Sequence, residues 1–149
     1  MPDRAPTLGT DFDAPYFHVG LVVEDLDAAM EELSAATGLQ WAKVIRREIG
    51  DWTYRLVYST TGPPYVELVE GGEGTPWDVS TGSRLDHLGW WIGDVDAELE
   101  RLAATGVPVE RDLRELGSAA FVKAPASGLK IELIGRDRRE RFEQMFSGR

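Results

Sequence analysis

Two stretches of the chain alternate in polarity with a period of two, which predicts β-strands because successive side chains of a strand point to opposite faces. In residues 16–23 and 87–92, one face is wholly apolar, and the other carries a histidine followed two residues later by a glycine. The apolar positions are Phe17, Val19, Leu21 and Val23 in the first stretch and Leu88, Trp90 and Ile92 in the second. We expect these faces to pack against helices, which leaves both histidines on the concave face of a sheet.

A helix is predicted directly after each of these strands. Asp25 and Asp94 are good N-cap residues, each with a second acid in the first turn, and apolar residues then recur at helical spacing. Both helical segments end in the same Ala-Thr-Gly sequence, in which Gly38 and Gly106 are suited to terminate a helix. The same units in the same order indicate an internal repeat.

The remainder of each half has room for three more strands. Alternation predicts them at about 41–49, 52–59 and 65–69 in the first half and at about 108–114, 119–124 and 130–134 in the second. Small and turn-forming residues predict a linker at about 71–84, and a last helix is expected over 137–146. The chain is thus predicted to be one α+β domain, residues 1–149, with two βαβββ modules at about 16–70 and 85–135.

Four side chains with metal-binding chemistry occupy equivalent positions in the two halves. His18 and His87 are the only histidines, and Glu67 and Glu132 each alternate with aliphatic residues in a late strand, so that they turn toward the same face as the histidines. A single histidine in a strand is more often a hydrogen-bonded core residue, and a single glutamate usually lies on a wet face. The recurrence of both at equivalent positions favours a shared metal site.

The ligand types restrict the chemistry of such a site. The chain has no cysteine, which excludes disulfides, thiolate ligands and a cysteine nucleophile. Imidazole and carboxylate suit one divalent ion, Zn, Ni, Co, Mn or Fe(II), and two of each favour five- or six-coordination with positions left for water or substrate. A metal of this kind acts as a Lewis acid on a carbonyl and stabilises an enolate or enediolate.

Composition excludes several other classes of function. The formal net charge of −10 opposes binding to nucleic acid or to an anionic membrane surface. No apolar run reaches the roughly 18 residues that a membrane span needs, and residues 1–15 are polar, without the apolar core of a signal peptide. We therefore expect a cytoplasmic protein that binds neither nucleic acid nor membranes.

Over about residues 16–135 the chain resembles the vicinal oxygen chelate superfamily, which includes glyoxalase I, methylmalonyl-CoA epimerase, extradiol dioxygenases and bleomycin-resistance proteins. The segments that carry the resemblance are His18-Val19-Gly20-Leu21, Asp25-Leu26-Asp27-Ala28, Val66-Glu67-Leu68, Asp86-His87-Leu88-Gly89, Asp94-Val95-Asp96-Ala97 and Ile131-Glu132-Leu133. The resemblance implies that the two modules form a curved, incomplete eight-stranded barrel around the metal. It also implies that His18, Glu67, His87 and Glu132 are its four ligands, a set similar to that of bacterial glyoxalase I.

The sequence departs from glyoxalase I where that enzyme holds glutathione. Val22 stands where an arginine is usual, and Gly71-Gly72 offers no asparagine after the first glutamate. Segments 65–70 and 85–106 look closer to the epimerase branch, and phosphates of a CoA thioester could then meet Arg46, Arg47, Arg111 and Arg114. Val22, Trp91 and Phe121, together with Trp41, are candidates to line an apolar substrate pocket.

The resemblance implies a metal-dependent isomerase, epimerase or lyase that shifts a proton next to a carbonyl through a metal-chelated enolate or enediolate. Its partner would be a small carbonyl or thioester substrate. Glu132 is the first candidate for the proton carrier, Glu67 is its symmetry mate, and Glu48 is a candidate second base. The alternative is a metal-free protein that binds a drug or natural product in the same cavity; a dioxygenase fits less well, because those members use three ligands. The superfamily also implies a symmetric homodimer.

Overall fold

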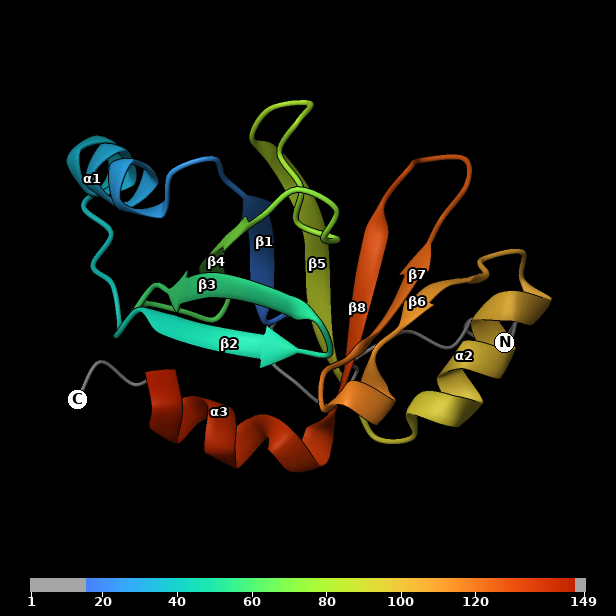
Figure 1. Cartoon of the computed structure of the whole chain (residues 1–149). Coiled ribbons are helices and arrows are strands. Elements are labelled where there is room, and N and C mark those ends of the chain that lie inside the picture. Colours follow the sequence, from blue (N-terminus) through green and yellow to red (C-terminus); the bar gives the residue numbers. More distant parts are fainter. Residues whose placement is uncertain (1–15, 147–149) are drawn as a thin grey trace.

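The computed structural model describes residues 16–146, which form an eight-stranded curved sheet with helices on its outer and open sides (Figure 1). The strands are β1 (His18–Val22), β2 (Ile45–Ile49), β3 (Trp52–Tyr58), β4 (Tyr65–Gly71), β5 (Arg84–Ile92), β6 (Val109–Asp112), β7 (Ala120–Lys123) and β8 (Lys130–Gly135). The α-helices are α1 (Leu26–Thr37), α2 (Val95–Ala104) and α3 (Arg139–Phe146), and the short 3₁₀ helices are η1 (Arg114–Leu116) and η2 (Arg136–Arg138). The predicted order of two βαβββ modules is confirmed.

The sheet has the order β2-β3-β4-β1-β5-β8-β7-β6, which reads as two copies of one module joined at their first strands. Within the modules, β1 runs parallel to β4 and β5 runs parallel to β8. The two modules meet through the antiparallel pair β1–β5. This pairing places the first strand of each module, and therefore each histidine, at the centre of the sheet.

The two helices α1 and α2 begin and end as the sequence predicts. Asp25 accepts a hydrogen bond from the Ala28 N–H at 3.0 Å, and Asp94 accepts one from the Ala97 N–H at 3.0 Å. After the helices, Gly38 and Gly106 adopt left-handed backbone with φ of 77° and 90°, a conformation that other residues rarely tolerate. The N-caps of the repeat are therefore reproduced in both helices, whereas at the C-terminal end Gly38 caps α1 and Thr105 caps α2, with Gly106 following it.

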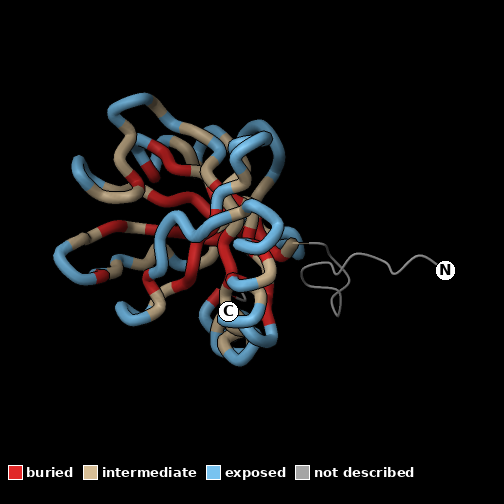
Figure 2. The backbone as a smooth tube through the Cα atoms, turned by 90° about the vertical axis from the view of Figure 1, so that its right-hand side faces the viewer, coloured by how far each residue is buried: buried red, intermediate tan, exposed pale blue. Residues whose placement is uncertain are grey.

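The outer faces of the central strands pack against the helices of their own modules. Leu21 and Val23 join Leu68 and the buried Leu26 of α1 in one apolar cluster. Trp90 and Ile92 join Leu99 and Leu102 of α2 in another. In Figure 2 the buried segments run through the middle of the molecule, where the two modules meet, and the exposed segments are mostly its peripheral loops and turns. The inner face is thus left to form a cavity.

Two aromatic residues lie elsewhere than the alternation predicts. Phe17 precedes β1 and does not share its outer face; its ring stacks on Trp91 with 4.0 Å between the centroids. Trp41 was expected to face inward, but its indole Nε1–H donates to Ser34 Oγ at 2.9 Å on α1. The strand predicted at 41–49 is continuous only from Ile45; before it, Trp41 forms an isolated antiparallel bridge with Ser59 while its indole packs against α1.

The last helix, α3, lies across the open side of the sheet, near β2 (Figure 1). Its Phe142 and Phe146 rings contact Tyr58 of β3, with centroid separations of 4.8 and 4.4 Å. The helix therefore forms part of the wall of the concave side rather than an appendage. Over residues 16–146, no helix is both long and apolar enough for a membrane crossing.

Candidate metal centre and cavity

The strand pairing brings the four predicted ligands together on the inner face. His18 of β1 lies opposite Gly89 of β5, and His87 of β5 lies opposite Gly20 of β1. Glu67 and Glu132 come from β4 and β8, which flank the central pair on either side. One donor atom from each of the four residues lies within 4.8 Å of every other, and all four residues are buried.

The imidazole Nε2 atoms and the carboxylates face one another at short range. The two Nε2 atoms of His18 and His87 are 2.9 Å apart, and Glu132 Oε2 lies 2.9 and 2.8 Å from them. Glu67 Oε1 is 3.2 Å from His87 Nε2 and 3.8 Å from His18 Nε2. Glu132 Oε2 is buried between these two imidazole nitrogens. Donor atoms crowded in this way are arranged for a cation between them.

Two glycines make room for the histidines. A Cβ atom on Gly20 would overlap the His87 ring, and one on Gly89 would overlap the His18 ring. Each glycine stands two residues after the histidine of its own module, so that each module clears space for the imidazole of the other. The His-x-Gly pattern seen twice in the sequence is therefore a packing requirement of the shared site.

Asp86 fixes the orientation of His87 from behind. Its Oδ2 accepts a hydrogen bond from His87 Nδ1 at 2.9 Å, and its Oδ1 contacts Lys130 Nζ at 3.2 Å. With the proton of the neutral ring held on Nδ1, the Nε2 lone pair points into the site, as a metal ligand requires. His18 has Phe17 at the corresponding position, and its buried Nδ1 has no hydrogen-bond partner among the described residues. The two histidines are thus held in different ways.

The electrostatic field at this point favours positive charge. Burial alone would lower the pKa of His87, but Glu132, Asp86 and Glu67 outweigh it and raise that pKa well above the ordinary value. Burial would raise the pKa of Glu132, yet the neighbouring imidazoles hold it below its ordinary value. Positive charge is thus stabilised where the donor atoms converge. In the metal-free protein this charge is a proton bound to imidazole. Geometry, crowding and field all fit a divalent metal ion.

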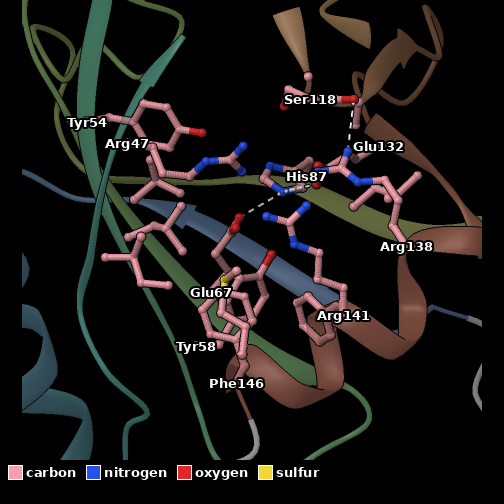
Figure 3. A pocket seen from close by; sticks show the side chains of 18 of the residues that line it. Arg47, Tyr54, Tyr58, Glu67, His87, Ser118, Glu132, Arg138, Arg141 and Phe146 are labelled. Atoms are coloured by element: carbon pink, nitrogen blue, oxygen red, sulfur yellow. Dashed lines mark hydrogen bonds and ion pairs between the residues drawn. The ribbon is translucent and has the colours of Figure 1, made fainter.

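A cavity of about 620 Å³ opens above these groups, and Glu67, His87 and Glu132 lie in its wall (Figure 3). Its aromatic lining is Tyr54, Tyr58, Trp77, Trp91, Phe121, Phe142 and Phe146. Burial raises the pKa of Tyr54 to about 12 and that of Tyr58 well above its ordinary value, with a contribution from the Glu67 and Glu132 carboxylates. Both phenols therefore keep their protons at neutral pH and can donate hydrogen bonds.

The structure places the other predicted site residues in and around this cavity. Trp91 and Phe121 line it, whereas Val22 is fully buried in the apolar cluster beside it and is not part of the wall. Glu48 is exposed on β2, on the face opposite Ile45 and Ile49, and does not reach the cavity. Strand alternation explains this, because Glu48 is one residue out of phase with the inward positions.

The four arginines considered for phosphate binding separate into two pairs. Arg46 and Arg47 line the cavity. Arg111 lies over the Trp52 ring, 5.2 Å from its centroid, and Arg114 is paired with Asp112 and Asp96, so neither lines the cavity.

Several cavity residues were not identified from the sequence. Tyr54 and Tyr58 share the inner face of β3, and the alternation of residues 52–58 carried that signal. Trp77 lies in the linker but is buried, with its ring stacked on Tyr54 at 4.1 Å. Arg138 and Arg141 come from η2 and α3. Their spacing of three residues puts them on one side of the helical segment, but nothing in the sequence shows where that segment docks.

This fold and centre define a class of protein in which two βαβββ modules hold four side chains that could bind a metal ion at the floor of a shared cavity. The chain belongs to the glyoxalase/bleomycin resistance protein/dioxygenase superfamily, whose family model matches residues 17–123. The resemblance read from the sequence is confirmed at the level of family and fold. Among curated proteins, none matches the chain significantly.

Solved structures with the same fold include two epimerases and a synthase. Methylmalonyl-CoA epimerase from Mycobacterium tuberculosis is 24% identical over 80% of this chain and 86% of that one, with a TM-score of 0.59. The Streptomyces coelicolor epimerase in complex with 2-nitronate-propionyl-CoA is 23% identical over 80% and 95%, with a TM-score of 0.61. A mutant of 4-hydroxymandelate synthase from Streptomyces coelicolor is 16% identical over 89% and 52%, with a TM-score of 0.61. These likenesses establish the fold.

Proposed function

We propose that this protein is a metal-dependent enzyme of the glyoxalase or epimerase type, an isomerase, epimerase or lyase that moves a proton at the carbon next to a carbonyl. The observation that carries the proposal is the convergence of two imidazoles and two carboxylates at the floor of a cavity large enough for a small molecule. The epimerases among the structural neighbours share this fold, and one of them is described in complex with methylmalonyl-CoA. A CoA thioester or another small carbonyl compound is therefore the proposed kind of substrate.

His18, Glu67, His87 and Glu132 would hold one divalent ion, Zn, Ni, Co, Mn or Fe(II). When bound, such an ion supplies a Lewis acid that stabilises negative charge on a carbonyl oxygen. The remaining chemistry falls to groups of the chain itself. Glu132 is the proposed proton carrier, because its carboxylate lies in the cavity wall, where it can reach the carbon next to the carbonyl of a bound substrate, and positioned carboxylates act as general bases.

Glu67 occupies the equivalent position in the first module and is the proposed second acid–base group. Its Oε1 lies across the site from Glu132, and both carboxylates line the cavity. Two carboxylates on opposite sides of one centre suit an epimerase, which takes a proton from one face of a carbon and returns it to the other. Tyr54 and Tyr58, both protonated at neutral pH, would orient polar groups of the substrate.

A second candidate function is the binding of a drug or natural product without catalysis. The aromatic lining of the cavity favours it, since flat apolar ligands stack well on such side chains. A protein that only binds a small molecule, however, does not need four converging side chains with metal-binding chemistry, or glycines that make room for two of them. The centre is therefore better explained by catalysis.

Glu132→Gln separates the two functions, because the amide keeps an oxygen near the metal position and about the same volume but removes the base. With metal-loaded protein and carbonyl ligands found by thermal-shift screening, NMR would follow incorporation of solvent deuterium at the α-carbon. We expect the wild type to exchange this hydrogen and the variant to lose about 10²–10⁴-fold in rate while still binding ligand. Glu48→Gln, the same change at an exposed position outside the cavity, serves as the control and should retain the wild-type rate.

The result that decides against catalysis comes from the wild type. If metal-loaded wild-type protein incorporates no deuterium into several tightly bound carbonyl ligands, the binding function replaces the proposed one. Exchange that continues unchanged in Glu132→Gln would instead remove Glu132 from the role of base and leave Glu67 to be tested in the same way.

A further inference from the structure

The cavity has a charge opposite to that of the whole chain. The protein carries a net charge of −10, yet among the described residues that line the cavity the only acidic ones are the candidate ligands Glu67 and Glu132. The basic lining residues are Lys43, Arg46, Arg47, Arg138 and Arg141. Basic side chains gathered in a concave space of an acidic protein indicate a site for an anion.

Three of these arginines point toward the metal centre from two separate parts of the chain. Figure 3 shows the guanidinium groups of Arg47, Arg138 and Arg141 directed toward the space beside Glu67, His87 and Glu132. Arg47 belongs to β2, where it is paired with Tyr54 of β3, and the other two belong to η2 and α3. The docking of α3 on the inner face is what brings the two groups of arginines together.

None of these guanidinium groups is paired with a carboxylate of the described residues. Arg138 donates one hydrogen bond to the Ser118 carbonyl oxygen at 3.1 Å, which fixes its direction. Among residues 16–146, none of the three arginines has an acidic side chain within 4.0 Å, and this includes Glu67 and Glu132. An exposed arginine without a partner is ordinary, but three that converge on one enclosed space repel one another and need an anion between them.

Binding of a metal ion at the centre would not change the need for this anion. A divalent cation bound by Glu67 and Glu132 is neutralised by these two carboxylates, so the positive charge of the arginines stays uncompensated when the centre is filled. A guanidinium presents a planar pair of donors that matches a carboxylate, and such charged hydrogen bonds are stronger than neutral ones. Since no described residue supplies the compensating negative charge, an anionic ligand is suited to this space.

We propose that Arg47, Arg138 and Arg141 form a carboxylate-binding site, and that the substrate is an organic acid that also carries a carbonyl group for the metal centre. This inference rests on the proposed function, of which it specifies the substrate class. The carboxylate is held by the arginines, the carbonyl end faces Glu67 and Glu132, and the apolar part contacts the aromatic wall. Because Arg141 belongs to α3 and Arg138 to the adjoining η2, ligand binding in the cavity also involves this C-terminal helical segment.

Binding of paired acids and neutral analogues tests the assignment without requiring turnover. Zinc-loaded full-length protein would be titrated by NMR or calorimetry with acetate and acetamide, pyruvate and pyruvamide, and phenylpyruvate and its methyl ester. We expect each acid to bind more tightly than its neutral partner. Arg47→Met, Arg138→Met and Arg141→Met should each weaken acid binding by about 10- to 100-fold, as expected for a lost hydrogen bond to a charged group. Binding of the neutral partners and the metal content should stay the same.

Arg101→Met on the outer helix α2 is the matched control and should leave acid binding unchanged, and Arg47→Lys should retain part of it because the charge remains. The proposal is wrong if no acid in the series binds more tightly than its neutral partner. It is also wrong if the preference survives all three variants, since the acids would then be held by the metal alone. Arginine-dependent acid binding in a protein that exchanges no α-hydrogen would support this site and contradict only the proposed catalysis.

Discussion

Gly20 and Gly89 lie under the imidazole rings of His87 and His18, with no space for even a methyl group. At these positions a single added carbon would overlap an imidazole ring, because each glycine is paired directly with the histidine of the other strand. The consequence is local to the metal centre, since the remainder of β1 and β5 keeps its ladder of hydrogen bonds.

Gly20→Ala is therefore expected to displace His87 and to weaken metal binding strongly, and to lower the free energy of unfolding by about 1–3 kcal/mol through overpacking. Gly72→Ala is the control, because Gly72 has ordinary backbone and no atom within 4 Å of an added Cβ. Metal titration and chemical denaturation of both variants check the expectation. Equal metal affinity in Gly20→Ala and the wild type would show that the imidazoles are not held as described.

At the same scale, the sequence was sufficient to predict the four converging side chains but not their surroundings. His18, Glu67, His87 and Glu132 were found because a repeat places equivalent residues on one face of equivalent strands. Arg138 and Arg141 could not be found in this way, since α3 has no counterpart in the first module. Glu48 was considered because of its position between two strands, although alternation already turns it away from the cavity.

At the scale of secondary-structure elements, Glu70 links three of them. Its carboxylate accepts the Leu26 N–H at the start of α1 at 2.7 Å and two hydrogen bonds from Arg55 of β3 at 3.1 and 3.0 Å. The Arg55 hydrogen bonds hold the pKa of Glu70 below its ordinary value, against the opposing effect of partial burial. The contact fixes the angle at which α1 enters the outer face of the sheet.

A depressed pKa contributes stability that is present above the unfolded-state pKa and is lost as the pH falls through the folded-state value. We expect Glu70→Gln to lower the free energy of unfolding by about 1–2 kcal/mol at pH 7, the scale of hydrogen bonds to a charged group. The difference from the wild type should shrink as the pH falls below about 4.3, the ordinary pKa of glutamate. Denaturant unfolding at several pH values measures this, with Glu73→Gln in the exposed loop after β4 as control. A difference that does not change with pH would contradict the role given to the Glu70 charge.

At the scale of the whole molecule, the strand order follows from the repeat and from the family resemblance. The position of α3, which forms part of the cavity wall, does not. The first strands of the two modules pair with each other, and this pairing brings the candidate ligands together on the inner face. The position of α3 depends on contacts of Phe142 and Phe146 with Tyr58 across the concave side. Such long-range packing leaves no periodic signal in a sequence.

The assembly state remains a prediction. The sheet ends at two edge strands, β2 and β6, and β6 is exposed along its length, with Val109 44% exposed; Leu85 on β5 is 60% exposed. Open edges with apolar side chains are commonly covered by a second copy, so we expect a symmetric homodimer. Light scattering at micromolar concentration should give twice the mass of the chain, and a mass of one chain would count against the expectation.

The metal content of the purified protein tests the central claim most directly. Protein prepared without chelators and measured by elemental analysis should contain about one divalent metal ion per chain, because four buried ligands converge on a single point. The double variant His18→Ala/His87→Ala should lose this ion, while the Gly72→Ala control keeps it. Stoichiometric retention of metal by the double variant would contradict the account, since the ion would then be held somewhere other than between the two modules.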